Sequence, residues 1–309
     1  MTRLHGLDAL RGIAALCIVY FHVLGGGEVP NKGYLAVDFF FMLSGYVLAR
    51  TYEPRMEDRL GALKFVAARY RRLWPTIFLG TLLGVMLLPP VTLGQFILGA
   101  LMIPLLSPGM FAFPLNSPSW SASLEIVLNA FHALVFRHVS NGPLLVAVLF
   151  SAAITLFALP SGHGVDRGPW GGELVWGIFR GLISYPLGII LWRTWKDKPP
   201  LLLPAWLTFA ILPVFVIASS PWAAGYPWAD LVFIIIVCPL LIAGGLNTAP
   251  RWGAFMGAIS FPLYAIHDPI MEWAGTDVVS RSIAAMLATA LCCGYQLLSQ
   301  RRSKRTSVV

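Results

Sequence analysis

Residues 7–22 read LDALRGIAALCIVYFH (Leu7 to His22), and this stretch decides the fold class. It is apolar enough to begin a membrane span, yet it carries Asp8, Arg11 and His22. A charged side chain at the centre of a bilayer costs at least about 2.5–3.5 kcal/mol, so ionisable residues inside a span usually have a function. The stretch therefore predicts a membrane helix whose ionisable residues have a functional role.

The composition extends this prediction to the whole chain. Of its 309 residues, 57% are hydrophobic and 12% are charged, against roughly 25% charged residues in a soluble domain. Apolar segments of about 20 residues recur along the sequence. The predicted fold class is therefore all-α: a polytopic integral membrane protein with about ten transmembrane helices and with both termini in the cytoplasm.

The apolar segments, eleven in all, cover residues 6–25, 33–50, 73–88, 92–107, 119–136, 143–160, 174–192, 200–219, 229–246, 253–270 and 279–298. The fourth lies between Pro89-Pro90 and a Pro/Gly/Ser-rich stretch, so we interpret it as re-entrant or interfacial. Ten spans then keep most Lys and Arg residues inside, whereas an eleventh would move RTWKDK and RRSKR outside, against the positive-inside rule. We expect a transmembrane domain over residues 1–300 and a basic cytoplasmic tail over residues 301–309.

The net charge of +8 is a topology signal in this setting, because most cations flank the spans. It does not predict a nucleic-acid partner. The cysteines all fall in apolar segments and form no C-x-x-C pair, so the sequence predicts neither a disulfide framework nor a metal site. They are Cys17, Cys238, Cys292 and Cys293.

Arg11 and His22 share one face of the first helix. Eleven residues turn a helix by about 1,100°, roughly 20° net, and advance it by about 16 Å. With a cytoplasmic N-terminus, Arg11 lies near the inner end of the span and His22 near the outer end. Asp8 can pair with Arg11 one turn away. The alternative is a structural ion pair and a histidine satisfied by a neighbouring helix.

A polar stripe follows residues 119–136, where Ser121, Glu125, Asn129 and His132 recur at helical spacing. Such a stripe must face the bundle interior, because lipid cannot satisfy its hydrogen bonds. In the ten-span topology Glu125 lies at about the depth of His22. A carboxylate beside an imidazole would make a general base. A stripe that only packs helices together is the alternative.

Other polar residues in the spans leave more than one interpretation open. Asp38 lies near the outer end of its span, and Ser44, with the next glycine, indicates close helix packing. Tyr264, His267 and Asp268 lie toward the outer side of their span, where they either line an outer cavity or anchor the interface. Arg180 is an intramembrane charge without a partner that the sequence names.

The predicted loop FVAARYRRLWP (Phe65 to Pro75) carries Arg69, Arg71 and Arg72. These arginines either anchor the topology or pair with the phosphates of a ligand. No Walker A or G-x-G-x-x-G motif accompanies them, which argues against a nucleoside-triphosphate site.

Taken in order, these stretches resemble the membrane acyltransferase 3 family over nearly the whole chain. Each motif is modest alone, but five in register are specific. The matches are R-x10-H (Arg11, His22), G-V-D-x-F-F-x-x-S-G (Asp38, Phe40, Ser44, Gly45), R-x-x-R-x-x-P (Arg69, Arg72, Pro75), W-S-x-x-x-E (Trp120, Ser121, Glu125) and S-x-x-x-Y-x-x-H-x-P (Ser260, Tyr264, His267, Pro269).

The resemblance implies transfer of an acyl group, usually acetyl, from cytoplasmic acyl-CoA to hydroxyls beyond the bacterial cytoplasmic (inner) membrane. Family acceptors include surface polysaccharides, lipopolysaccharide, peptidoglycan, Nod factors and some lipids or macrolides. The outer loops are short here, and Ala122-Ser123 stands where larger residues are common. The chain ends soon after its last span, so we expect a standalone acyltransferase without an SGNH-type esterase domain. The acceptor is left open.

The resemblance also implies that Arg11 and His22 are essential, and the roles of the other residues are our hypothesis. We expect acyl-CoA, with acetyl as its acyl group, as donor substrate, and no metal. The partners we expect are membrane lipid and a glycan or glycolipid acceptor; the oligomeric state is not predicted. His22 acts as general base or is itself acylated. We expect the catalytic residues to be His22, Arg11 and Glu125, the donor ligands to be Arg69, Arg71, Arg72 and Arg11, and the other substrate contacts to be Asp38, Ser44, Trp120, Tyr264 and His267.

Two functions of other classes use the same residues. A helical bundle with intramembrane His, Glu and Arg is also typical of a proton-coupled transporter. The sequence has neither inverted repeats nor paired broken helices, which argues against that alternative. An inactive scaffold in a polysaccharide export complex is a further alternative, which nothing in the sequence demands.

Overall fold

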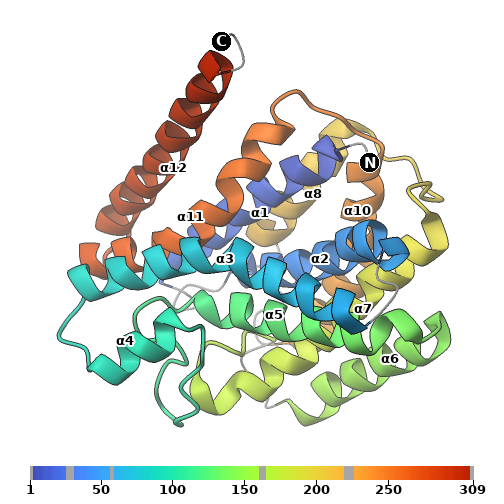
Figure 1. The fold of residues 1–309 in the computed structure, drawn as a ribbon, viewed down its shortest axis with the longest axis horizontal. Helices are drawn as coiled ribbons and strands as arrows, with labels where there is room; N and C mark the ends of the chain where they lie inside the picture. Colours follow the sequence, from blue (N-terminus) through green and yellow to red (C-terminus); the bar gives the residue numbers. More distant parts are fainter. Residues whose placement is uncertain (1–2, 26–30, 56–58, 160–164, 219–225, 307–309) are drawn as a thin grey trace.

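The computed structural model describes residues 3–25, 31–55, 59–159, 165–218 and 226–306. In these ranges the secondary structure is helical, and no strand occurs beyond one isolated bridge between Phe111 and Trp170. This confirms the all-α fold class (Figure 1). The helices are α1 (His5–Val23), α2 (Ala36–Tyr52), α3 (Arg59–Leu87), α4 (Leu93–Ala100), α5 (Ser119–Leu134), α6 (Asn141–Ala158), α7 (Leu174–Trp195), α8 (Ala205–Ala218), α9 (Pro227–Val232), α10 (Cys238–Leu246), α11 (Gly253–Ala274) and α12 (Val278–Thr306).

Each predicted span coincides with a helix, with a π-helical segment (Phe233–Val237) joining α9 to α10. The segment interpreted as re-entrant or interfacial contains α4, whose eight residues extend about 12 Å, far less than the roughly 30 Å of a hydrocarbon core, so α4 is too short to span. Six helices among the described residues are long and apolar enough to cross a membrane: α1, α5, α6, α7, the α9–α10 helix and α12. Ten spans with cytoplasmic ends stay a prediction.

The predicted loop before Pro75 is wrong, because α3 runs without a break from Arg59 to Leu87 and includes Pro75. Its Ala, Leu and Arg residues are strong helix formers, and neighbouring groups in a membrane bundle compensate for a proline inside a helix. The arginines of this stretch are therefore held on a rigid helix. At the other end of the chain, α12 continues through Thr306, so most of the predicted tail is helical.

Glycines let two pairs of helices approach closely. Gly253 of α11 lies against the backbone carbonyl of His5 in α1, and Gly188 of α7 lies against the carbonyl of Met42 in α2; an added Cβ would overlap either carbonyl. Small residues at such contacts are the usual means of packing membrane helices. Gly45 packs on α7 in the same way, which confirms the close packing predicted at this glycine, whereas Ser44 lines a cavity and donates to Glu125.

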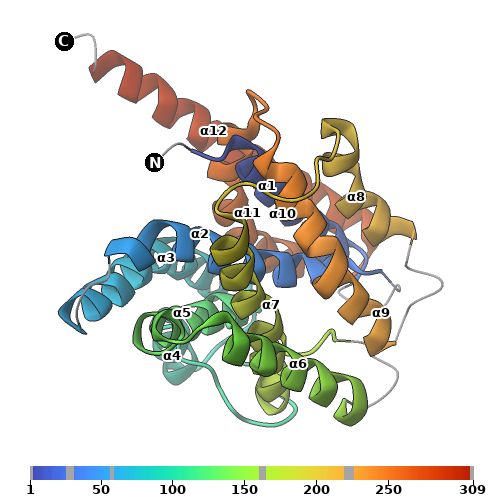
Figure 2. The ribbon, with the colours of Figure 1, turned by 90° about the vertical axis from the view of Figure 1, so that its right-hand side faces the viewer.

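The outer faces of α6 and α12 are apolar and exposed. Phe157 of α6 is 84% exposed and Tyr295 of α12 is 70% exposed, and both helices lie at opposite edges of the bundle (Figures 1 and 2). Apolar surface on this scale needs a covering. Lipid supplies it in a membrane, so the surface agrees with an integral membrane protein.

Candidate active site

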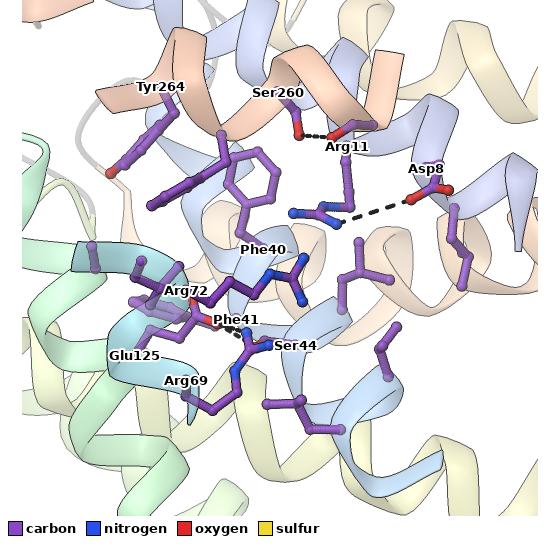
Figure 3. Close-up of a pocket in the computed structure, with 18 of the residues that line it drawn as sticks. Asp8, Arg11, Phe40, Phe41, Ser44, Arg69, Arg72, Glu125, Ser260 and Tyr264 are labelled. Atoms are coloured by element: carbon purple, nitrogen blue, oxygen red, sulfur yellow. Dashed lines mark hydrogen bonds and ion pairs between the residues drawn. The ribbon is translucent and has the colours of Figure 1, made fainter. Parts of the chain in front are cut away.

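A cavity of about 720 Å³ lies between α1, α2, α3, α5 and α11 (Figure 3). Its volume falls within the range of small-molecule sites. Arginines outnumber carboxylates in its lining, so the cavity attracts an anionic ligand. The charged residues that line it are Arg3, Arg11, Arg50, Arg55, Arg69, Arg72, Asp8 and Glu125.

Glu125 anchors one wall of the cavity. Its Oε1 accepts a hydrogen bond from the Ser44 hydroxyl at 2.7 Å and lies 3.2 Å from Nη2 of Arg69. The side chain of Arg69 is only 8% exposed, so the carboxylate fixes a nearly buried guanidinium at the cavity wall. Figure 3 shows this group together with Arg72.

Arg11 and Arg72 bring two more cations to the same space from different helices. Their guanidinium groups point toward each other across the cavity (Figure 3). Arg11 lies 4.0 Å from Asp8, which confirms the predicted pairing, whereas Arg72 forms no ion pair with any residue that the structure describes. Arg71, predicted as a third donor ligand, is exposed and is not part of the cavity lining.

Three side chains line the cavity at the end nearest His267 and His22. The hydroxyls of Ser121 and Tyr264 are 2.5 Å apart, and the Tyr264 hydroxyl also donates to the carbonyl of Pro118 at 3.0 Å. The ring of Phe40 packs edge-on against Tyr264. Beyond this layer, the His267 ring lies 6.0 Å from that of Tyr264 between centroids.

His22 lies next to His267, outside the cavity lining. Its Nδ1 is 3.3 Å from Oδ1 of Asp268, and its ring lies edge-on to His267 at 5.0 Å between centroids. The carboxylate expected beside His22 was Glu125, and this expectation is wrong. α5 packs so that Glu125 meets Ser44 and Arg69, and α11 supplies the carboxylate instead.

Asp38 and Trp120 lie away from the cavity lining. Asp38 Oδ2 accepts from Nη2 of Arg180 at 2.7 Å, with both side chains at most 2% exposed. The Arg180 guanidinium also lies 5.4 Å from the Trp120 ring centroid. The ion pair supplies the partner of Arg180 that the sequence did not identify. A contact of Asp38 or Trp120 with substrate stays a prediction.

The polar stripe on α5 faces the interior, as predicted, but its two halves have different surroundings. Ser121 and Glu125 line the cavity. Asn129 and His132 are fully buried and both contact the Tyr185 hydroxyl. His132 also lies 3.1 Å from Glu53, which pairs with Arg193. Sequence reasoning missed this second network, because Glu53 and Arg193 lie far from the stripe in the sequence.

Comparison with known proteins assigns the class. The family model described as an acyltransferase domain matches residues 4–296, so the chain belongs to this acyltransferase family. The "Putative membrane-bound transacylase BcsY" of Komagataeibacter xylinus is 26% identical over 99% of this chain and 83% of its own length. "Protein 2 in picA locus" of Rhizobium radiobacter is 32% identical over 49% of this chain and 92% of its own length.

A third relative carries a more specific name. The "Putative peptidoglycan O-acetyltransferase YrhL" of Bacillus subtilis is 36% identical over 24% of this chain, which covers 12% of that relative. No solved structure matches. Family membership and the apolar helices together identify the chain as an acyltransferase and an integral membrane protein, which favours the enzyme over the transporter.

Proposed function

We propose that the protein transfers an acyl group, acetyl in the first instance, from cytoplasmic acyl-CoA to a hydroxyl of an extracytoplasmic glycan or glycolipid. His22 acts as general base at the bacterial cytoplasmic membrane. The observation that carries the proposal is the arginine-lined cavity, whose lining residue Tyr264 contacts His267, which in turn contacts His22. Its relatives include proteins named as O-acetyltransferases.

The donor occupies the cavity in this proposal. Guanidinium groups bind phosphate through paired, charge-assisted hydrogen bonds, and Arg11, Arg69 and Arg72 present three of them to one space. Apolar side chains, among them Phe40 and Phe41, line the same cavity and suit the uncharged pantetheine arm. Arg71 has no part in donor binding here, because its side chain lies outside the lining.

The acceptor approaches His22 from the other side. The His22 side chain is 22% exposed although it does not line the cavity. The acceptor therefore reaches it at the C-terminal end of α1, and not through the cavity beside Arg11. The thioester must pass the layer formed by Ser121, Tyr264 and Phe40 to meet the acceptor. Motion of these side chains is therefore part of each turnover.

The test uses membrane vesicles of both orientations from cells that make the full chain. Radiolabelled acetyl-CoA is added outside, and label is counted in extracted glycans and lipids. Inside-out vesicles should transfer label, because they expose the cytoplasmic face. His22→Ala should insert at normal levels and transfer none. The control is His138→Ala, which removes an exposed histidine that lies outside the cavity lining.

Two outcomes contradict the proposal. Full transfer by His22→Ala would remove the base from the mechanism, and proton-driven uptake without covalent label would favour a transporter. Label that stays on the denatured protein, and is absent from His22→Ala, would indicate the acyl-histidine route instead of direct attack.

A further inference from the structure

We infer that Asp268 is a positioning residue that orients His22, so that Nε2 of His22 takes the proton from the acceptor hydroxyl. The inference rests on the proposed function and specifies two things in it: the nitrogen of His22 that acts as the base, and the carboxylate that orients the ring. The late motif of the family resemblance includes His267 and Pro269 and leaves the position between them open. In this chain that position holds a carboxylate beside the proposed base.

The contact determines the tautomer of His22. Asp268 Oδ1 lies 3.3 Å from Nδ1, and an ionised carboxylate only accepts hydrogen bonds. Nδ1 must therefore carry the proton, which leaves the lone pair on Nε2. Because the other ring nitrogen sets which nitrogen can act as a base, Asp268 directs the basic atom of His22 away from itself.

Asp268 is itself held in place. Its Oδ2 accepts from the backbone N–H of Ser117 at 2.9 Å, and its side chain is 8% exposed. Next to this contact, the Asn116 amide donates to the carbonyl of Ala265 at 2.9 Å. The segment before α5 thus clamps the middle of α11. A clamped carboxylate keeps one orientation, as a group that positions a base must.

The backbone of His22 is also fixed. Nη1 of Arg281, in α12, donates to the carbonyl of His22 at 3.1 Å. The end of α1 is therefore tied to α12, just as Asp268 of α11 is tied to the segment before α5.

His267 does not meet the same requirements. Its Nδ1 lies 3.0 Å from the carbonyl of Leu263, and a carbonyl only accepts, so this histidine is oriented by its own helix. Its side chain is fully buried, and its Nε2 has no partner in the described part of the chain. It therefore cannot reach a hydroxyl that arrives from outside. Of the two, only His22 combines an orienting carboxylate with exposure.

The transfer step balances without a further reactant. The acceptor O–H bond breaks and its proton moves to Nε2 of His22, while the oxygen forms a bond to the thioester carbonyl carbon. The tetrahedral intermediate then collapses and its C–S bond breaks. The thiolate takes the proton back from Nε2, which leaves an O-acyl ester and free CoA. Asp268 stabilises the imidazolium formed between these steps and is not consumed.

The experiment compares Asp268→Asn, Asp268→Glu and the control Asp277→Asn in the full chain. Asp277 is an exposed carboxylate that caps the start of α12 through the N–H of Ser280, a task that asparagine also performs. Inside-out vesicles with endogenous acceptor are supplied with radiolabelled acetyl-CoA at a series of concentrations. Both the maximal rate and the KM for acetyl-CoA are measured.

Asp268→Asn should lower the maximal rate by about 10²-fold or more and change the KM for acetyl-CoA by less than about twofold, because Asp268 does not line the cavity. Asp268→Glu should recover part of the rate, since it restores the charge. Asp277→Asn should match the wild type.

The outcomes separate the two proposals. Absence of transfer by the wild-type protein, or full transfer by His22→Ala, would overturn the proposed function itself. Wild-type transfer that is lost in His22→Ala but kept at full rate in Asp268→Asn would overturn only the role of Asp268. A rise in KM with an unchanged maximal rate, or a loss that Asp268→Glu does not reverse, would also overturn it.

Discussion

Neutralising Arg72 tests the donor site most directly, because Arg71 provides a matched control. The two residues are neighbours on α3 and carry the same charge, but consecutive helical side chains point about 100° apart. Only Arg72 lines the cavity. Arg72→Gln should therefore weaken acetyl-CoA binding, and Arg71→Gln should leave it unchanged.

The expected size follows from the exposure of Arg72. A hydrogen bond to a charged group contributes about 1.5–3 kcal/mol, and solvent reduces this for an exposed side chain such as Arg72. We therefore expect a loss of about 1–2 kcal/mol, which corresponds to a rise in Kd of about fivefold to thirtyfold. Removing the charge should also flatten the salt dependence of binding.

The Kd for acetyl-CoA is measured by equilibrium binding of the tritiated ligand to the purified full chain in lipid nanodiscs. The measurement is made at low and at high salt. Equal weakening by both variants would show that only the overall positive charge of α3 matters. Unchanged binding in both would show that acyl-CoA does not occupy the cavity, which would refute the reasoning from its lining.

Two further predictions concern stability, measured by thermal unfolding in detergent. Asp38→Asn leaves the buried guanidinium of Arg180 without its ionic partner and should cost about 3–5 kcal/mol; an unchanged unfolding midpoint would contradict the structural role of this pair. Gly188→Ala forces a Cβ onto the carbonyl of Met42 and should cost about 1–3 kcal/mol. Its control is Gly294→Ala in α12, where a Cβ meets nothing within 4 Å; equal destabilisation by both alanines would argue against close packing of α2 and α7.

The sequence by itself determined the helices and the residues that matter within them. Apolar segment lengths are local properties, and each predicted span has its helix. Periodicity is local as well: the stripe from Ser121 to His132 faces the interior as its spacing predicted. The continuous α3 was missed because charged residues at a proline were interpreted as a loop end.

Only the tertiary structure decided which of these residues meet. Glu125 pairs with Arg69, and Asp268 takes the place beside His22; Arg72 lines the cavity and Arg71 does not. Periodicity defines a face on one helix. The depth, tilt and rotation of each helix against its neighbours come from packing, including the glycine contacts of α1 with α11. A residue's partner on another helix depends on those relations, so it can be read only from the assembled bundle.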